Sequence, residues 1–177
     1  MRFAAGDFME NKKSLFVGFK GKQNSSGLLV TELSKSLSLS DASDSDNFCL
    51  LTNSFPGVKR GIDSIPGTYK QVIMFGCDKS LKSCVRIERF AEKDGIKFGT
   101  NLDLELLSKK LRNEGIENTI SVISTHYLCN EAYWYALQKF EGKAALIHIP
   151  TIKNADESFL SKTKSVFEEL SLSGLTR

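Results

Sequence analysis

The chain has 177 residues, of which 41% are hydrophobic and 25% are charged, and its formal net charge is +3. This length favours one compact domain, residues 1–177, in which residues 1–13 form a loose start. Acidic and basic residues are interspersed and no basic stripe carries interleaved aromatics, so we expect no nucleic-acid partner. No apolar run has the length of a membrane span or of a signal peptide, so we expect a cytoplasmic protein without a membrane partner.

Apolar runs of strand length alternate along the chain with segments of helical periodicity. The expected strands are residues 15–19, 48–52, 71–76, 84–91, 119–124 and 144–150. The expected helices are residues 28–37, 58–65, 102–111, the segment that follows Cys129, and about 155–172. This alternation predicts an α/β fold, a three-layer sandwich around a mostly parallel, twisted central sheet.

Turn signals separate these segments. Residues 38–47 are rich in Ser and Asp and indicate an exposed loop. Pro56-Gly57 breaks the pattern before the second helix, and Asp94-Gly95 predicts a turn after the strand 84–91. Residues 92–100 then pass almost directly into the next helix.

The chain contains four cysteines and two histidines, and these small numbers limit the metal and redox chemistry that it can support. The cysteines form no C-x-x-C pair, so we expect no zinc site and no cofactor of any kind. Free thiols fit a reducing compartment.

Cys129 is expected where a strand gives way to a helix. Backbone N–H groups at a helix start are unpaired and carry partial positive charge, a setting that favours the nucleophilic thiolate. Cysteine is also among the most buried residue types, so a structural thiol is the alternative interpretation.

His148 lies near the end of the next apolar strand. Neighbouring parallel strands bring their ends together, so its imidazole could take the proton of Cys129 and later give it to a leaving amine. Glu88 is the candidate that orients the imidazole, or else a surface carboxylate paired with Arg86 or Arg89. His126 is expected in the loop before Cys129, where it either shapes a pocket or has no role.

Four short motifs follow one another along the chain. They are Val17-Gly18-Phe19, Ile87-Glu88-Arg89-Phe90-Ala91, Tyr127-Leu128-Cys129-Asn130 and Ile147-His148-Ile149-Pro150. In this order they resemble the motifs of the pyroglutamyl peptidase I family, the pyrrolidone-carboxylate peptidases. The resemblance implies a cysteine peptidase that hydrolyses the amide bond after an N-terminal pyroglutamyl or related acyl residue, with a peptide or small acyl amide as its partner.

The resemblance also implies roles for single residues. Cys129 would be the nucleophile, His148 the general base and acid, and Glu88 the group that orients His148. Phe19, Lys82 and Tyr127 would contact the substrate, and the protein would form a homo-oligomer.

Several positions depart from the family pattern. Phe19 is followed by Lys20-Gly21-Lys22 where the family has a second Phe, and Lys82 replaces an arginine six residues before the glutamate. Thr125 stands where the family has Gly, and the segment after the glutamate motif is shorter. The triad of Cys129, His148 and Glu88 therefore matches the family pattern better than the residues of the substrate pocket do. The substrate could carry another acyl group.

Two other interpretations stay open. A non-catalytic relative could use the fold for binding or assembly, which the altered pocket favours and the intact Cys, His and Glu oppose. An unrelated doubly wound ligand-binding protein would need a glycine-rich phosphate loop, and the sequence contains neither G-x-G-x-x-G nor a P-loop.

Overall fold

The computed structural model describes residues 13–38 and 48–175. The expectations for the loose start 1–13 and for the loop 38–47 therefore lie, apart from Lys13 and Ser38, outside the described residues. The strands are β1 Ser14–Phe19, β2 Phe48–Leu51, β3 Gln71–Asp78, β4 Cys84–Glu88, β5 Phe90–Lys93, β6 Ile96–Gly99, β7 Glu117–Ser121 and β8 Ala144–Pro150. The helices are α1 Ser25–Ser38, α2 Phe55–Ser64, α3 Leu104–Asn113, α4 Leu128–Lys139 and α5 Glu157–Ser173, with a 3-10 turn at Ile152–Asn154.

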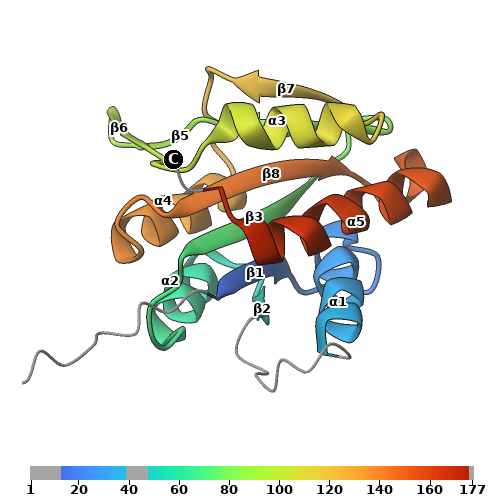
Figure 1. The fold of residues 1–177 in the computed structure, drawn as a ribbon. Helices are drawn as coiled ribbons and strands as arrows, with labels where there is room; N and C mark the ends of the chain where they lie inside the picture. The colour runs from blue at the N-terminus through green and yellow to red at the C-terminus, as the bar shows by residue number, and fades with distance from the viewer. Residues whose placement is uncertain (1–12, 39–47, 176–177) are drawn as a thin grey trace, which may run out of the picture.

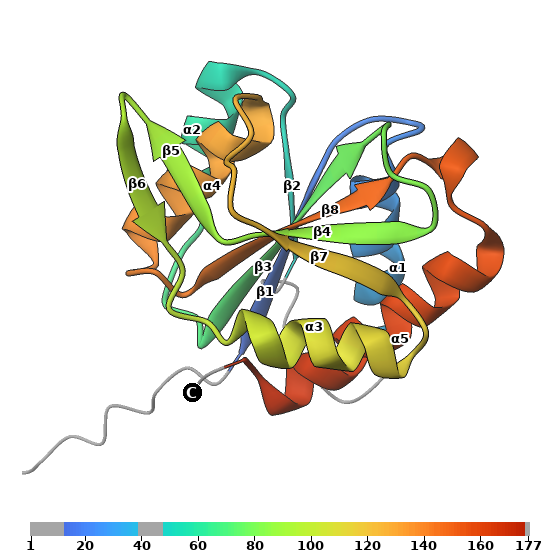
Figure 2. The same ribbon diagram turned by 90° about the horizontal axis from the view of Figure 1, so that it is seen from above.

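The described residues form a six-stranded sheet of order β2-β1-β3-β8-β4-β7 and a small β5-β6 hairpin. Strands β2, β1, β3 and β8 are parallel to one another. Strand β4 pairs antiparallel with β8, and β7 pairs parallel with β4. The strands fan out when seen from above (Figure 2), which is the normal twist of such a sheet. The predicted α/β fold with a mostly parallel, twisted sheet is confirmed.

Helices cover both faces of the sheet (Figures 1 and 2). Helices α1, α3 and α5 pack on one face, where Phe16, Phe75 and Phe167 belong to one apolar cluster. Helices α2 and α4 and the β5-β6 hairpin pack on the other face, in a cluster that includes Val17 and Tyr133. Alternate residues of each buried strand supply the two clusters, as the pleat requires.

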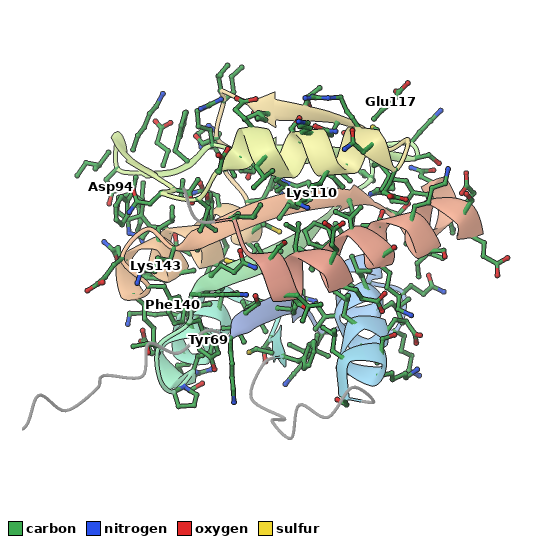
Figure 3. All side chains as sticks on the ribbon, viewed as in Figure 1. Tyr69, Asp94, Lys110, Glu117, Phe140 and Lys143 are labelled. Atoms are coloured by element: carbon green, nitrogen blue, oxygen red, sulfur yellow. The ribbon has the colours of Figure 1, made fainter. Side chains whose placement is uncertain are left out.

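Contacts between side chains tie neighbouring elements together within the layers (Figure 3). Tyr69 and Phe140 meet edge to face with ring centroids 6.0 Å apart, before β3 and after α4. Lys110 on α3 pairs with Glu169 on α5. No helix in the described ranges is long and apolar enough to cross a bilayer.

The expected break at Pro56-Gly57 is wrong, because both residues lie in the first turn of α2. Proline is tolerated there, since the first N–H groups of a helix have no intrahelical acceptor. Ser54 caps the helix and its hydroxyl accepts from the N–H of Gly57 at 3.1 Å.

The expected strand 84–91 is divided between two sheets. β4 ends at Glu88 and β5 begins at Phe90, so that β4 stays in the central sheet while β5 pairs with β6. The turn at Asp94-Gly95 is confirmed, with φ values of 52° and 77°. The sequence prediction missed β6, a short strand whose main buried contact is the ring of Phe98 against Trp134, with centroids 6.3 Å apart.

The expected strand 119–124 is corrected most. β7 ends at Ser121 and lies at the edge of the sheet, antiparallel to β8 and separated from it by β4. Residues 122–127 form a loop that leads from this edge to the start of α4 (Figure 2). The loop therefore places Cys129 at the start of α4. The strand that precedes Cys129 in the sequence is not a parallel neighbour of β8.

Candidate active site

Strand register alone places several polar residues around His148. His148 on β8 is paired with Gly76 of β3 on one side and with Arg86 of β4 on the other. Glu88 follows two residues after Arg86, so both side chains point to the α4 face of the sheet. His148 and Glu88 are 4% and 2% exposed, and the site therefore has a buried base.

The imidazole of His148 and the carboxylate of Glu88 form a direct pair. Nδ1 lies 2.8 Å from Oε1 of Glu88. A carboxylate can only accept, so this pairing assigns the proton to Nδ1 and leaves Nε2 as an acceptor on the other side of the ring.

Nε2 of His148 and the sulfur of Cys129 both lie against Gly76. A Cβ atom at residue 76 would stand 2.9 Å from Nε2 of His148 and 3.0 Å from Sγ of Cys129. The ring and the thiol therefore occupy the space that any larger residue at 76 would fill. Gly76 is a requirement of the site that follows from close approach, not from a special backbone conformation.

Cys129 is the second residue of α4, as predicted for a residue near a helix start. Tyr127 is the N-cap and makes no side-chain cap hydrogen bond, so its side chain does not pair with the early N–H groups of α4. Asn130 fixes this end of the helix to β5, because its amide accepts from the N–H of Glu92 at 3.0 Å and donates to the carbonyl of Glu92 at 2.7 Å.

The expectation that this setting favours the thiolate is wrong for the resting site. Burial, the nearby Cys77 and the carboxylates of Glu88 and Asp78 raise the pKa of Cys129 to about 12, although a backbone hydrogen bond from Cys77 acts in the opposite direction. Desolvation outweighs the helix terminus because the thiol is largely enclosed. The resting group is a thiol, and a base must remove its proton.

Arg86 joins the site through two ion pairs. Its Nε lies 2.9 Å from Oε1 of Glu88, and its Nη2 lies 2.8 Å from Oδ2 of Asp78. Glu88 therefore contacts both His148 and Arg86, which the sequence had offered as alternatives. Burial opposes ionisation of Asp78, but hydrogen bonds from Ser80 and Arg86 lower its pKa to about 2.

A cleft of about 570 Å³ opens onto these groups. Its wall includes Cys129, His148, Arg86, Thr125 and Tyr127. Another cleft of about 670 Å³ lies at the β4-β7 edge, where its wall contains Cys84 but no histidine. Of these two clefts, only the first joins a thiol to a histidine.

The predicted substrate residues are placed less consistently. Tyr127 lies on the cleft wall and is 78% exposed. Lys82 is exposed in the β3-β4 loop and is not one of the residues of this wall, and His126 is exposed in the loop before Cys129. Phe19 is 2% exposed and packs in the apolar cluster beneath α2 and α4, and its contact with the substrate stays a prediction.

The sequence prediction missed the contributions of Asp78 and Arg86 and the steric role of Gly76. Arg86 and Glu88 share one face of β4, and that spacing was the available signal. No group of three or more His, Cys, Asp or Glu side chains in the described ranges could hold a metal ion.

No family model matches the sequence, and no curated protein matches it. Solved structures do match. The pyrrolidone carboxyl peptidase of Thermococcus litoralis is 23% identical with a TM-score of 0.64, covering 92% of this chain and 94% of that one. The pyroglutamyl peptidase I of Bacillus amyloliquefaciens is 15% identical with a TM-score of 0.69, covering 93% and 97%.

A mutant pyrrolidone carboxyl peptidase of Pyrococcus furiosus is 18% identical with a TM-score of 0.68, covering 92% of this chain and 99% of that one. Each similarity extends over nearly the whole length of this chain and of the solved structure. At such identities they establish architecture, and they agree with the four motifs of the sequence. The chain has the fold of the pyrrolidone carboxyl peptidases, the pyroglutamyl peptidase I type.

Proposed function

We propose that this chain is a cysteine peptidase that hydrolyses the amide bond after an N-terminal pyroglutamyl or related acyl residue. The observation that carries the proposal is the line of groups at the cleft. Glu88 holds Nδ1 of His148 at 2.8 Å, and Nε2 of His148 and Sγ of Cys129 both lie against Gly76. The fold of the solved peptidases supports the same reaction class.

In the proposed first step, Nε2 of His148 takes the proton of Cys129 while the sulfur attacks the acyl carbonyl. A C–S bond forms and the carbonyl oxygen becomes an oxyanion, which N–H groups at the start of α4 can stabilise. Because burial keeps Cys129 protonated at rest, proton removal must accompany attack. This coupling makes the imidazole indispensable.

In the second step the C–N bond breaks and the imidazolium gives its proton to the leaving amine. Water, deprotonated by the same imidazole, then attacks the thioester carbonyl. The C–S bond breaks, the acyl group leaves as a carboxylic acid, and the thiol is restored. Glu88 stabilises the imidazolium in both steps and keeps the ring oriented.

The test compares wild type with Cys129→Ser on a panel of chromogenic acyl amides, beginning with a pyroglutamyl amide. We expect turnover in wild type and a loss of at least about a thousandfold in the variant, because a hydroxyl is a much weaker nucleophile. Alkylation by iodoacetamide gives an independent readout of the thiol. We expect faster labelling at Cys129 near neutral pH than at Cys49, another thiol whose pKa burial raises.

Absence of turnover on the whole panel, together with labelling of Cys129 no faster than that of Cys49, would contradict the peptidase proposal. A second candidate is then a non-catalytic binding protein, which the buried position of Phe19 favours. Acyl amides that bind in the cleft without being cleaved would support this second candidate.

The setting and partners remain part of the proposal. All four cysteines, each within the described ranges, are free, which suits a reducing cytoplasm. The proposed partner is a peptide or small acyl amide, and the proposed assembly is a homo-oligomer. Sedimentation of the full chain over a range of concentrations tests the assembly.

A further inference from the structure

A chain of charged groups continues behind the imidazole. Asp78 contacts Arg86, Arg86 contacts Glu88, and Glu88 contacts His148, with separations of 2.8, 2.9 and 2.8 Å. We propose that Arg86, anchored by Asp78, is a positioning residue that keeps Glu88 ionised and oriented toward His148. This inference rests on the peptidase function proposed above.

The backbone places Arg86 where it can do this. Arg86 stands opposite His148 in the β4-β8 ladder, and Glu88 follows on the same face of β4. The guanidinium spans two carboxylates, with Nε on Glu88 and Nη2 on Asp78. A lysine offers one compact ammonium and lacks this planar fork, so it could not hold both groups in the same way.

Glu88 needs a cation because it is deeply buried. Its side chain is 2% exposed, and Oε2 has no hydrogen-bond partner within the described residues. Both donors, Nε of Arg86 and Nδ1 of His148, converge on Oε1. Burying a carboxylate is costly unless it is paired with a cation, and the charge of Arg86 offsets the desolvation of Glu88.

Asp78 lets Arg86 act without opposing catalysis. An uncompensated guanidinium beside His148 would disfavour the imidazolium that each proton transfer creates. Asp78 offsets that charge and fixes the direction of the fork.

Other titratable groups also face this line. Cys77 and Cys129 lie on the cleft wall with Lys79. Tyr133 donates its O–H to the backbone carbonyl of Glu88, and burial raises the pKa of that phenol, so it stays neutral. Among the groups described, Arg86 is therefore the cation that contacts Glu88.

The experiment follows alkylation of Cys129 by iodoacetamide against pH in the full chain, with peptide mass spectrometry to assign the site. In Arg86→Ala, Glu88 loses the guanidinium that contacts its Oε1. We expect the acid limb of the rate profile to move upward by about one pH unit, equivalent to about tenfold slower labelling on that limb. Millimolar guanidinium ion should restore part of the rate by filling the vacated space.

Arg89→Ala is the matched control, because Arg89 adjoins Glu88 in sequence but is 47% exposed and pairs with Glu105 on the surface. We expect an unchanged profile and no response to guanidinium. Thermal unfolding monitored by circular dichroism verifies that each variant is folded.

Arg86→Lys keeps the positive charge, and it tests the positioning role of Arg86 if Arg86→Ala does not fold. We expect its acid limb to stay near that of wild type while its rate falls several-fold, since one ammonium cannot serve both carboxylates. A folded Arg86→Ala with the wild-type acid limb, or an Arg86→Lys as fast as wild type at every pH, overturns the inference. Absence of turnover on the amide panel, together with wild-type Cys129 that labels no faster than Cys49, contradicts the peptidase function itself, which is a different result.

Discussion

The two sides of the cleft are built in different ways. On the chemical side, Gly76, Arg86, Glu88 and His148 stand on three adjacent strands whose register fixes their neighbours. On the other side, residues 122–127 form a loop that exposes Val122, Ile123 and Tyr127 by 66%, 76% and 78%. The strand pairing fixes where the polar atoms of the site lie. The loop forms only the opposite border of the cleft.

This difference separates reaction from specificity. A buried side chain held by strand pairing and by charged partners has few alternative positions, so a change there should affect the chemical step. An exposed side chain on a loop can adapt to several ligands, so a change there should affect binding.

Glu88→Gln should break the strand side most completely. An amide can donate its N–H to Nδ1, which would move the ring proton to Nε2 and leave no acceptor facing Cys129. We expect kcat to fall by about ten-thousandfold with little change in KM, as for the loss of an orienting carboxylate in other triads. Glu105→Gln, a change at a carboxylate that is 69% exposed, is the control and should leave kcat unchanged.

Gly76→Ala should separate the base from the thiol. The new methyl group would lie 2.8 Å from Cδ2 of His148 and 3.0 Å from Sγ of Cys129, so ring and sulfur must move apart. We expect kcat to fall by about a hundredfold, with a stability loss of about 1–3 kcal/mol from overpacking. Enzyme kinetics and urea unfolding measure the two effects.

Gly99→Ala is the matched control for this substitution. Its new Cβ would meet the carbonyl oxygen of Arg89 at an ordinary distance of 3.7 Å. Full activity in Gly76→Ala would mean that Cys129 and His148 need not approach across residue 76, and the strand side would lose its main steric argument.

Asp78→Asn tests how much the charge pair contributes to folding. The pKa of Asp78 is lowered from 3.8 to about 2, so its stabilisation is complete above the unfolded pKa and disappears as the pH falls through the folded one. We expect Asp78→Asn to lower the free energy of unfolding by about 1–2 kcal/mol at neutral pH. The difference from wild type should shrink between about pH 4 and pH 2 in urea titrations. A difference that is the same at every pH would show that the carboxylate charge is not its source.

The sequence predicted the chemical side better than the loop side for physical reasons. Strand 144–150 was placed correctly because a continuous apolar run ending in Pro150 has few alternatives. Strand 119–124 was extended too far because Val122 and Ile123 are β-branched, yet they lie in the exposed loop. Propensity could not show that β4 and β7 run antiparallel to β8, since orientation depends on long-range pairing.

The pairing of residues within the site was also only partly predictable. Cys129, His148 and Glu88 were selected by residue type and position, and the structure brings them together. Phe19 was selected by its motif, and the structure buries it together with every other residue of its strand. Arg86 was treated as a competitor of His148 because a sequence does not show that one carboxylate oxygen can accept from both.

Tyr127→Ala should have the smallest effect and tests the loop side. Its ring lies on the cleft wall and is 78% exposed, so it can contact a bound substrate but cannot hold Cys129 in place. We expect KM to rise about threefold to tenfold, as for the loss of one partly exposed aromatic contact, with kcat nearly unchanged. Lys82→Ala, in the β3-β4 loop, should change neither constant. If Tyr127→Ala instead lowers kcat at constant KM, the loop side also orders the reacting groups, and the separation of reaction from specificity fails at that residue.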